Sequence, residues 1–177
     1  MRKERLLLAL IAVAATVTVG SSLALAATKN SPTAGARVAT TKYHDISLAL
    51  ADGYGEFRDA AGIACIAQPG VGAMGVHFVK GSLVGDAVLD PAQPEALVYE
   101  PRTYSGGYKL VALEYIVFKD VWEAAGHTSP PSLFGQEFML TPSPNRFGIP
   151  AFYALHAWLF RGNPLGQLQP WNPRVDC

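Results

Sequence analysis

Residues 151–160 read Ala-Phe-Tyr-Ala-Leu-His-Ala-Trp-Leu-Phe, and His156 is the one side chain among them that can be charged near neutral pH. Alternate residues of an extended chain point to opposite faces, and here both faces are apolar. This pattern predicts a central β-strand covered on both sides. The histidine in it needs a polar partner, because burying a polar group without a hydrogen bond is costly.

A second long strand is predicted over residues 108–118, after the turn sequence Ser-Gly-Gly at 105–107. Alternation places Glu114 in an apolar row with Leu110, Ala112, Ile116 and Phe118. Burying an ionised and unpaired carboxylate costs more free energy than a small domain can lose. We therefore expect Glu114 to be protonated, paired through hydrogen bonds or bound to a metal ion.

A third candidate site residue is His77, in a short strand predicted over residues 73–79. Met74, Val76 and Phe78 are expected on one face of this strand, and His77 on the other. The adjacent Gly75 leaves space for another backbone or a ligand to approach.

The remaining elements complete an α+β fold. Further strands are expected at residues 96–99 and, at an edge, 134–140, and Asp120 and Glu123 are spaced as a capping box that opens a helical turn. One main N-terminal helix is predicted over residues 43–50, with Thr41 as its N-cap, Asp45 in its first turn and Gly53 after its end. We expect a curved, barrel-like antiparallel sheet of about four to six strands, packed against this helix and followed by a long irregular C-terminal tail.

The N-terminal sequence is typical of an export signal. Arg2, Lys3 and Arg5 precede an apolar run at residues 6–19, and Ala-Leu-Ala at 24–26 suits signal peptidase. The run is shorter than the roughly 20 residues that a membrane span needs. The expected organisation is a signal peptide at 1–26, a flexible leader at 27–39 and a single globular domain at 40–177, secreted or extracytoplasmic and without membrane attachment after cleavage.

The charge balance excludes some partners. The chain has 14 basic and 14 acidic residues, and removal of residues 1–26 takes away three basic and one acidic, leaving 11 and 13. Without a Lys/Arg cluster, the sequence offers no electrostatic surface for nucleic acid or anionic lipid. The sequence does not determine the oligomeric state.

Cys65 and Cys177 are the two cysteines of the chain. An even pair in a small exported domain is most simply one disulfide, which would hold the tail against an early loop. Two free thiols and a metal–thiolate site are the alternatives, but no C-x-x-C or C-x-x-H spacing supports them.

The sequence contains five short pieces to compare: Gly75 to Phe78, Leu113 to Tyr115, Leu155 to Phe160, Asn163-Pro164 and Trp171 to Cys177. Together they resemble a family of exported bacterial proteins of unassigned function, in which the first piece more often reads Tyr-His-Tyr. The resemblance runs from Tyr43 to the end of the chain. It implies that the pieces belong to one domain and supplies no activity or ligand.

His77, Glu114 and His156 together form a ligand set used by catalytic zinc and by mononuclear non-haem iron. Neighbouring strands can deliver such a set, because same-face side chains lie about 5 Å apart. The motifs H-E-x-x-H, G-x-S-x-G, P-loop and G-x-G-x-x-G are absent, as is the cupin His-x-His spacing. If the protein is an enzyme, Glu114 is expected to act as a general base or metal ligand, and the imidazoles as ligands or acid–base groups.

The expected function is a buried His/Glu/His pocket that binds a small molecule or a divalent metal, zinc or iron. Four aromatic residues are expected to line it. The alternative is a non-enzymatic structural or adhesion module in which the three polar residues only form a hydrogen-bond network in the core. The sequence does not decide whether the protein is an enzyme. The four aromatic residues are Phe78, Tyr115, Phe152 and Trp158.

Overall fold

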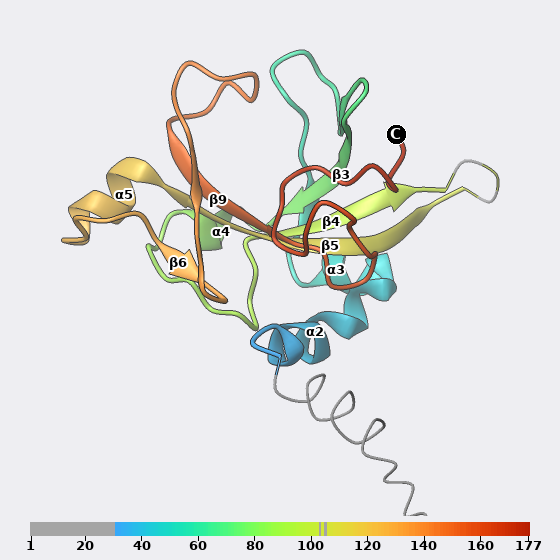
Figure 1. Ribbon diagram of the computed structural model, residues 1–177, viewed down its shortest axis with the longest axis horizontal. Coiled ribbons are helices and arrows are strands. Elements are labelled where there is room, and N and C mark those ends of the chain that lie inside the picture. The colour runs from blue at the N-terminus through green and yellow to red at the C-terminus, as the bar shows by residue number, and fades with distance from the viewer. Residues whose placement is uncertain (1–30, 103, 105) are drawn as a thin grey trace, which may run out of the picture. The chain divides into compact units, whose positions relative to one another are not determined.

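The computed structural model describes residues 31–102, 104 and 106–177 (Figure 1). The expected signal peptide and residues 27–30 of the expected leader lie outside the described residues. Pro32–Cys177 forms one compact unit. Within the described residues, no helix is both long and apolar enough to cross a membrane.

The α+β fold is confirmed, and its centre is a seven-stranded antiparallel sheet. The strand order is β1-β3-β4-β5-β9-β8, and β2 also pairs with β3. A separate hairpin joins β6 and β7. The strands are β1 (Gly55–Glu56), β2 (Cys65–Gln68), β3 (Gly72–Val79), β4 (Ala96–Pro101), β5 (Tyr108–Phe118), β6 (Ser132–Leu133), β7 (Gln136–Glu137), β8 (Met139–Thr141) and β9 (Phe152–Ala157).

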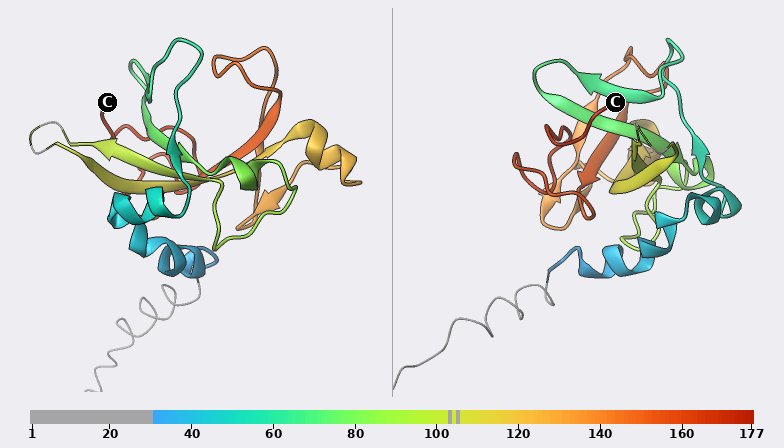
Figure 2. Two further views of the ribbon diagram at one scale, coloured as in Figure 1. Left: turned by 180° about the vertical axis from the view of Figure 1, so that it is seen from behind. Right: turned by 90° about the vertical axis from the view of Figure 1, so that its right-hand side faces the viewer.

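The sheet is antiparallel as expected, but it is open and is not a closed barrel, which corrects the barrel-like part of the expectation. The end strands β1 and β8 have two and three residues and pair only with β3 and β9. Such short strands provide too few hydrogen bonds to close a barrel. β3 and β9 nevertheless rise on the same side of β4 and β5, whereas the helices α2 and α3 lie on the other side (Figures 1 and 2).

The N-terminal helical region differs from the single helix expected. It consists of α2 (Ala34–Thr40), the 3-10 helix η1 (Thr41–His44) and α3 (Ile46–Ala51). Asp45 has an extended backbone and caps α3 by accepting a hydrogen bond from the Ser47 N–H at 3.0 Å, so the helix predicted over 43–50 is divided there. Helix α2 also corrects the expectation of a flexible leader up to residue 39, because Ala36 and Thr40 are buried.

The helices cover one face of the sheet and form the main core there. Two tyrosine hydroxyls link the helical layer to the sheet by hydrogen bonds. Tyr99 donates to the Tyr43 carbonyl at 2.8 Å, and Tyr54 donates to the Pro94 carbonyl at 2.7 Å. Buried hydroxyls need such acceptors, so these two bonds fix the position of the helical layer. The core includes Ala36, Ala49, Val76, Phe78, Leu97, Leu113, Tyr115, Val117 and Leu155.

A bulge in β5 breaks the expected alternation. Val98 pairs with Ala112 and Tyr99 with Leu110, which leaves Val111 as an extra residue. Leu110 therefore packs in the helix-side core, whereas Val111 and Ala112 belong to a cluster on the opposite face. The prediction that Leu110 shares the face of Glu114 is wrong, because the bulge shifts the register by one residue.

Two short helices follow strands: α4 (Gly81–Val84) after β3 and α5 (Lys119–Ala124) after β5. The expected turn at Asp120 is thus confirmed as a helix, but Phe118 is its N-cap, and the Asp120 side chain accepts only from the Val121 N–H. The edge strand expected at 134–140 is replaced by β7 and β8 around Phe138. The strand predicted over residues 151–160 is shorter than expected, since β9 covers only Phe152–Ala157. The tail that follows is irregular, as expected.

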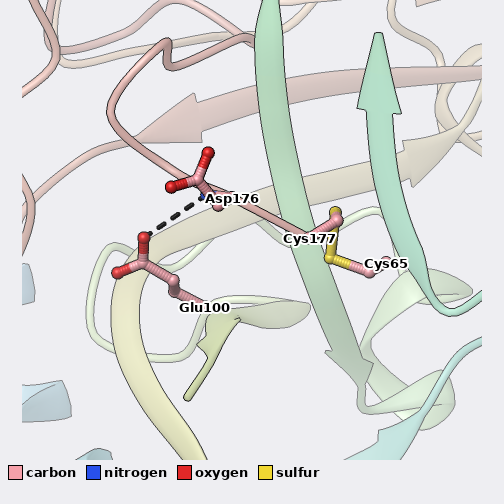
Figure 3. The surroundings of a disulfide bond; sticks show 4 residues. All are labelled: Cys65, Glu100, Asp176 and Cys177. Carbon is pink, nitrogen blue, oxygen red and sulfur yellow. Dashed lines mark hydrogen bonds between the residues drawn. A yellow bond between two sulfur atoms is a disulfide. The ribbon is translucent and has the colours of Figure 1, made fainter. Parts of the chain in front are cut away.

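The disulfide between Cys65 and Cys177 is confirmed, with the two Cα atoms 5.5 Å apart (Figure 3). The adjacent Asp176 N–H donates to the Glu100 carboxylate at 3.4 Å (Figure 3). Further up the tail, Asn172 exchanges backbone hydrogen bonds with Ala73 of β3. The tail is therefore attached to the β2–β3 end of the sheet by both covalent and hydrogen bonds.

Candidate functional site

The structure brings the three predicted polar residues together on the sheet face away from the helices. Glu114 of β5 lies directly opposite His156 of β9. On its other side Glu114 pairs with Ala96 of β4, and β3, which carries His77, lies beyond β4. Strands two places apart are roughly 10 Å apart. His77 lies opposite Val98 of β4, so its side chain reaches Glu114 diagonally, past the small side chain of Ala96.

The polar atoms of the three side chains are in contact. His77 Nε2 lies 3.2 Å from Glu114 Oε2 and 3.3 Å from His156 Nε2. His156 Nδ1 lies 3.3 Å from Glu114 Oε1. One atom from each residue can be chosen so that all three lie within 4.8 Å of one another. We call these three residues the triad.

All three residues are buried, and none is more than 6% exposed. Burial opposes ionisation of Glu114, but the neighbouring imidazoles of His156 and His77 hold its pKa below the ordinary value. Burial lowers the pKa of His156 to about 4, and the carboxylate of Glu114 only partly offsets this. At neutral pH the triad therefore holds a carboxylate and a neutral His156, the protonation states in which these groups bind metals.

The triad lines a cavity of about 320 Å³ whose other walls are mostly apolar. The walls come from β3, β5, β7, β8 and β9, from α4, from the loop before β9 and from the C-terminal tail. Apolar lining residues include Phe57, Met74, Ile116, Phe147, Ile149, Phe152 and Trp171. A concave apolar site with a few convergent polar groups is the usual form of a small-molecule site.

Of the four aromatic residues expected in the pocket, Phe152 lines the cavity. Trp158 does not line it but stacks beside His156, with ring centroids 6.0 Å apart, and donates from its indole nitrogen to the Gln169 carbonyl. The expectation for Phe78 and Tyr115 is wrong, because both belong to the helix-side core. Each follows a triad residue directly in its strand, so its side chain points to the opposite face.

Several lining residues were not expected from the sequence. Met74 was expected on the face of Val76 and Phe78, but it lines the cavity with His77. The β2–β3 register shifts between Ile66 and Ala67, next to Gly75, whose φ is +103°. This irregularity reverses the alternation before Val76.

Other lining residues come from segments without a secondary-structure period. Phe147 and Ile149 lie in the loop before β9, and Trp171 lies in the tail. Large apolar residues in such segments are the signal that could have suggested burial against the sheet.

The two remaining histidines lie elsewhere. His44 packs edge-on against Phe160, with ring centroids 4.8 Å apart. His127 is exposed and stacks on Trp122, with ring centroids 3.6 Å apart. Neither belongs to the cavity lining.

Comparisons with protein-family models, curated proteins and solved structures find no match to this chain. The resemblance to exported bacterial proteins therefore stays a prediction from sequence pieces. Any assignment of function rests on the geometry of the triad and its cavity.

Proposed function

We propose that the protein binds a divalent metal ion, zinc or iron, through His77, Glu114 and His156, and a small molecule in the cavity beside it. The observation that carries this proposal is the meeting of two imidazoles and one carboxylate at the wall of an apolar cavity. Two histidines and one carboxylate leave coordination positions open for water or a bound molecule. Such a site would suit catalysis, with the metal polarising the bound molecule.

The spacing of the ligand atoms supports a metal site. Metal–ligand bonds of about 2.05 Å place neighbouring ligand atoms about 3.3 Å apart in a tetrahedron and about 2.9 Å apart in an octahedron. The contacts from His77 Nε2 to Glu114 and His156 are 3.2 and 3.3 Å. Hydrogen bonds from nitrogen to oxygen are most often about 2.9 Å long. These two contacts fit the spacing of ligands that bind one ion.

The proposed location is outside the cytoplasm. The disulfide supports an oxidising compartment, because disulfides persist there and are rare in the cytosol. The export signal expected at residues 1–26 agrees with this location.

The test is the metal content of untagged protein, purified without chelators and then incubated with Zn²⁺ or Fe²⁺. We expect about one ion per chain in the wild type. Glu114→Gln should lose the ion, because an amide is a much weaker ligand than a carboxylate and keeps almost the same shape. Glu123→Gln is the matched control, since Glu123 lies on exposed α5 and pairs with Lys119. It should keep the ion.

A structural module is the second candidate. Among the described residues, no buried side-chain nitrogen or oxygen lacks a hydrogen-bond partner, so the triad is satisfied by its own contacts. In that case the wild type would bind neither ion in titration calorimetry, and Glu114→Gln would lower the melting temperature by breaking the network. This result would overturn the metal proposal.

A further inference from the structure

The cavity walls restrict the class of molecule that fits beside the triad. Phe57, Ile116, Phe147 and Phe152 surround the space with aromatic and branched aliphatic groups. Burial of apolar surface gives roughly 25 cal/mol per Å², so an apolar body is what these walls bind best.

The charges at the cavity restrict the class further. No Lys or Arg lines the cavity within the described part of the chain. The basic residues that adjoin lining residues in the sequence have other partners. Arg146 binds Asp59 at 2.6 Å, Lys119 binds Glu123 at 2.6 Å, Arg58 binds Glu56, and the Lys80 ammonium lies 5.7 Å from the centre of the Tyr54 ring. The carboxylates present are those of Glu114 and Glu137. A negatively charged body would have no counter-charge from the protein side chains.

The polar groups are divided between the deepest part of the cavity and its rim. The triad is buried, whereas Gln136, Glu137 and Gln169 are exposed. A molecule that fills the space between therefore meets polar atoms at its inner end and solvent at its outer end.

We propose that the cavity binds an uncharged, largely apolar molecule whose single polar group, such as a hydroxyl or carbonyl, meets the triad. This inference rests on the proposed function and names its ligand class for the metal-free protein, since a bound divalent ion would itself supply a counter-charge to an anion. The apolar fit depends on the cavity walls and not on the metal, so it can be measured separately.

The experiment uses the neutral fluorophore N-phenyl-1-naphthylamine and protein treated with a chelator. Binding should raise its fluorescence and quench tryptophan emission, because Trp171 lines the cavity. Decanol and decanoate, which share a chain length and differ in charge, then compete with the probe at pH 7.5. We expect decanol to compete at least about tenfold better, since an unpaired carboxylate is costly to bury. Equal competition would overturn the inference.

A filled cavity tests the position of the site. Ala154 is half-buried and lines the cavity, so Ala154→Trp should weaken probe binding by about tenfold or more through direct occlusion. Ala51→Trp, at the exposed end of α3, is the matched control and should bind normally. Unchanged binding by Ala154→Trp would overturn the inference.

A second measurement covers the case in which Ala154→Trp does not fold. Trp171→Phe should retain probe binding and lose part of the energy transfer to it. If the energy transfer to the probe were as large in that variant as in the wild type, the probe would lie outside the cavity, and the inference would be overturned. Zinc content, measured on the same preparations before chelation, reports on the metal proposal independently.

Discussion

Glu95, which directly precedes β4, and Glu114 of β5 are buried carboxyl groups, and their environments shift their pKa values in opposite directions. Burial raises the pKa of Glu95 to about 8, although the Ile116 N–H donates to it at 3.0 Å. At Glu114, the neighbouring imidazoles outweigh the effect of burial and lower the pKa of the carboxyl group. Near neutral pH, one carboxyl is therefore held mainly as the acid and the other as the ion, which is how one fold can provide both an acid and a base.

The raised pKa of Glu95 predicts how stability depends on pH. The folded state binds the Glu95 proton more tightly than the unfolded state, whose pKa lies near 4.5. The stabilisation is therefore fully present below pH 4.5 and is lost as the pH rises toward about 8. Glu95→Gln should flatten the fall in melting temperature between these limits. The same slope in wild type and variant would contradict the assignment.

The sequence predicted the individual residues of the triad because each of them is a polar residue in an otherwise apolar strand. Glu95 gave no such signal, since it follows Pro94 and directly precedes β4. Its burial depends on a hydrogen bond to β5, and the sequence pattern does not show which strand will approach. Long-range pairing therefore decided which carboxyl groups became buried.

The arrangement of the strands depends on the close approach of β3 to β4 at Gly75. Gly75 has a φ of +103°, and a Cβ atom added there would lie 2.7 Å from the Tyr99 carbonyl oxygen. No other residue fits this position without moving β3 or β4. The irregularity at Gly75 also places Met74 on the same face as His77.

We expect Gly75→Ala to lower the free energy of unfolding by at least about 2 kcal/mol, through the steric contact and the backbone strain. It should also weaken metal binding, because β3 carries His77. Gly55→Ala is the control, since Gly55 has no heavy atom within 4 Å of the added Cβ and no positive φ. Chemical denaturation measures the free energy of unfolding of both variants. An equal decrease in the two variants would refute the explanation.

The bounds of β5 were more predictable than its register. The predicted bounds of β5 match the structure because its apolar run ends sharply. The bulges at Val111 and beside Gly75 could not be predicted, since a bulge is defined by the residues on the partner strand. Because the bulges were not predicted, Leu110 and Met74 were assigned to the wrong faces of their strands.

For the molecule as a whole, the cavity depends on the tail. Leu168, Gln169, Pro170 and Trp171 close one side of it, and the disulfide and the Asn172 backbone hold them there. The sequence predicted the disulfide from an even number of cysteines in a chain with an expected export signal. It could not predict that the tail forms a cavity wall, because the tail has no secondary-structure period.

Replacement of both Cys65 and Cys177 by serine should therefore affect stability and binding together. The bridge spans 112 residues, and the chain-entropy model assigns about 5 kcal/mol to a loop of this length. We expect a lower melting temperature and weaker binding of N-phenyl-1-naphthylamine at a temperature where the variant is still folded. Wild-type affinity in that variant would show that the tail holds its position without the bridge.

The same bridge determines what a single proteolytic cut can release. Tyr104 is fully exposed in the connection between β4 and β5. A cut beside it separates His77 from Glu114 and His156 in the sequence, but Cys65 and Cys177 lie on opposite sides of the cut. The two fragments stay joined by the disulfide and by the β4–β5 hydrogen bonds. A nicked molecule thus keeps every residue of the triad and separates only when it is both reduced and unfolded.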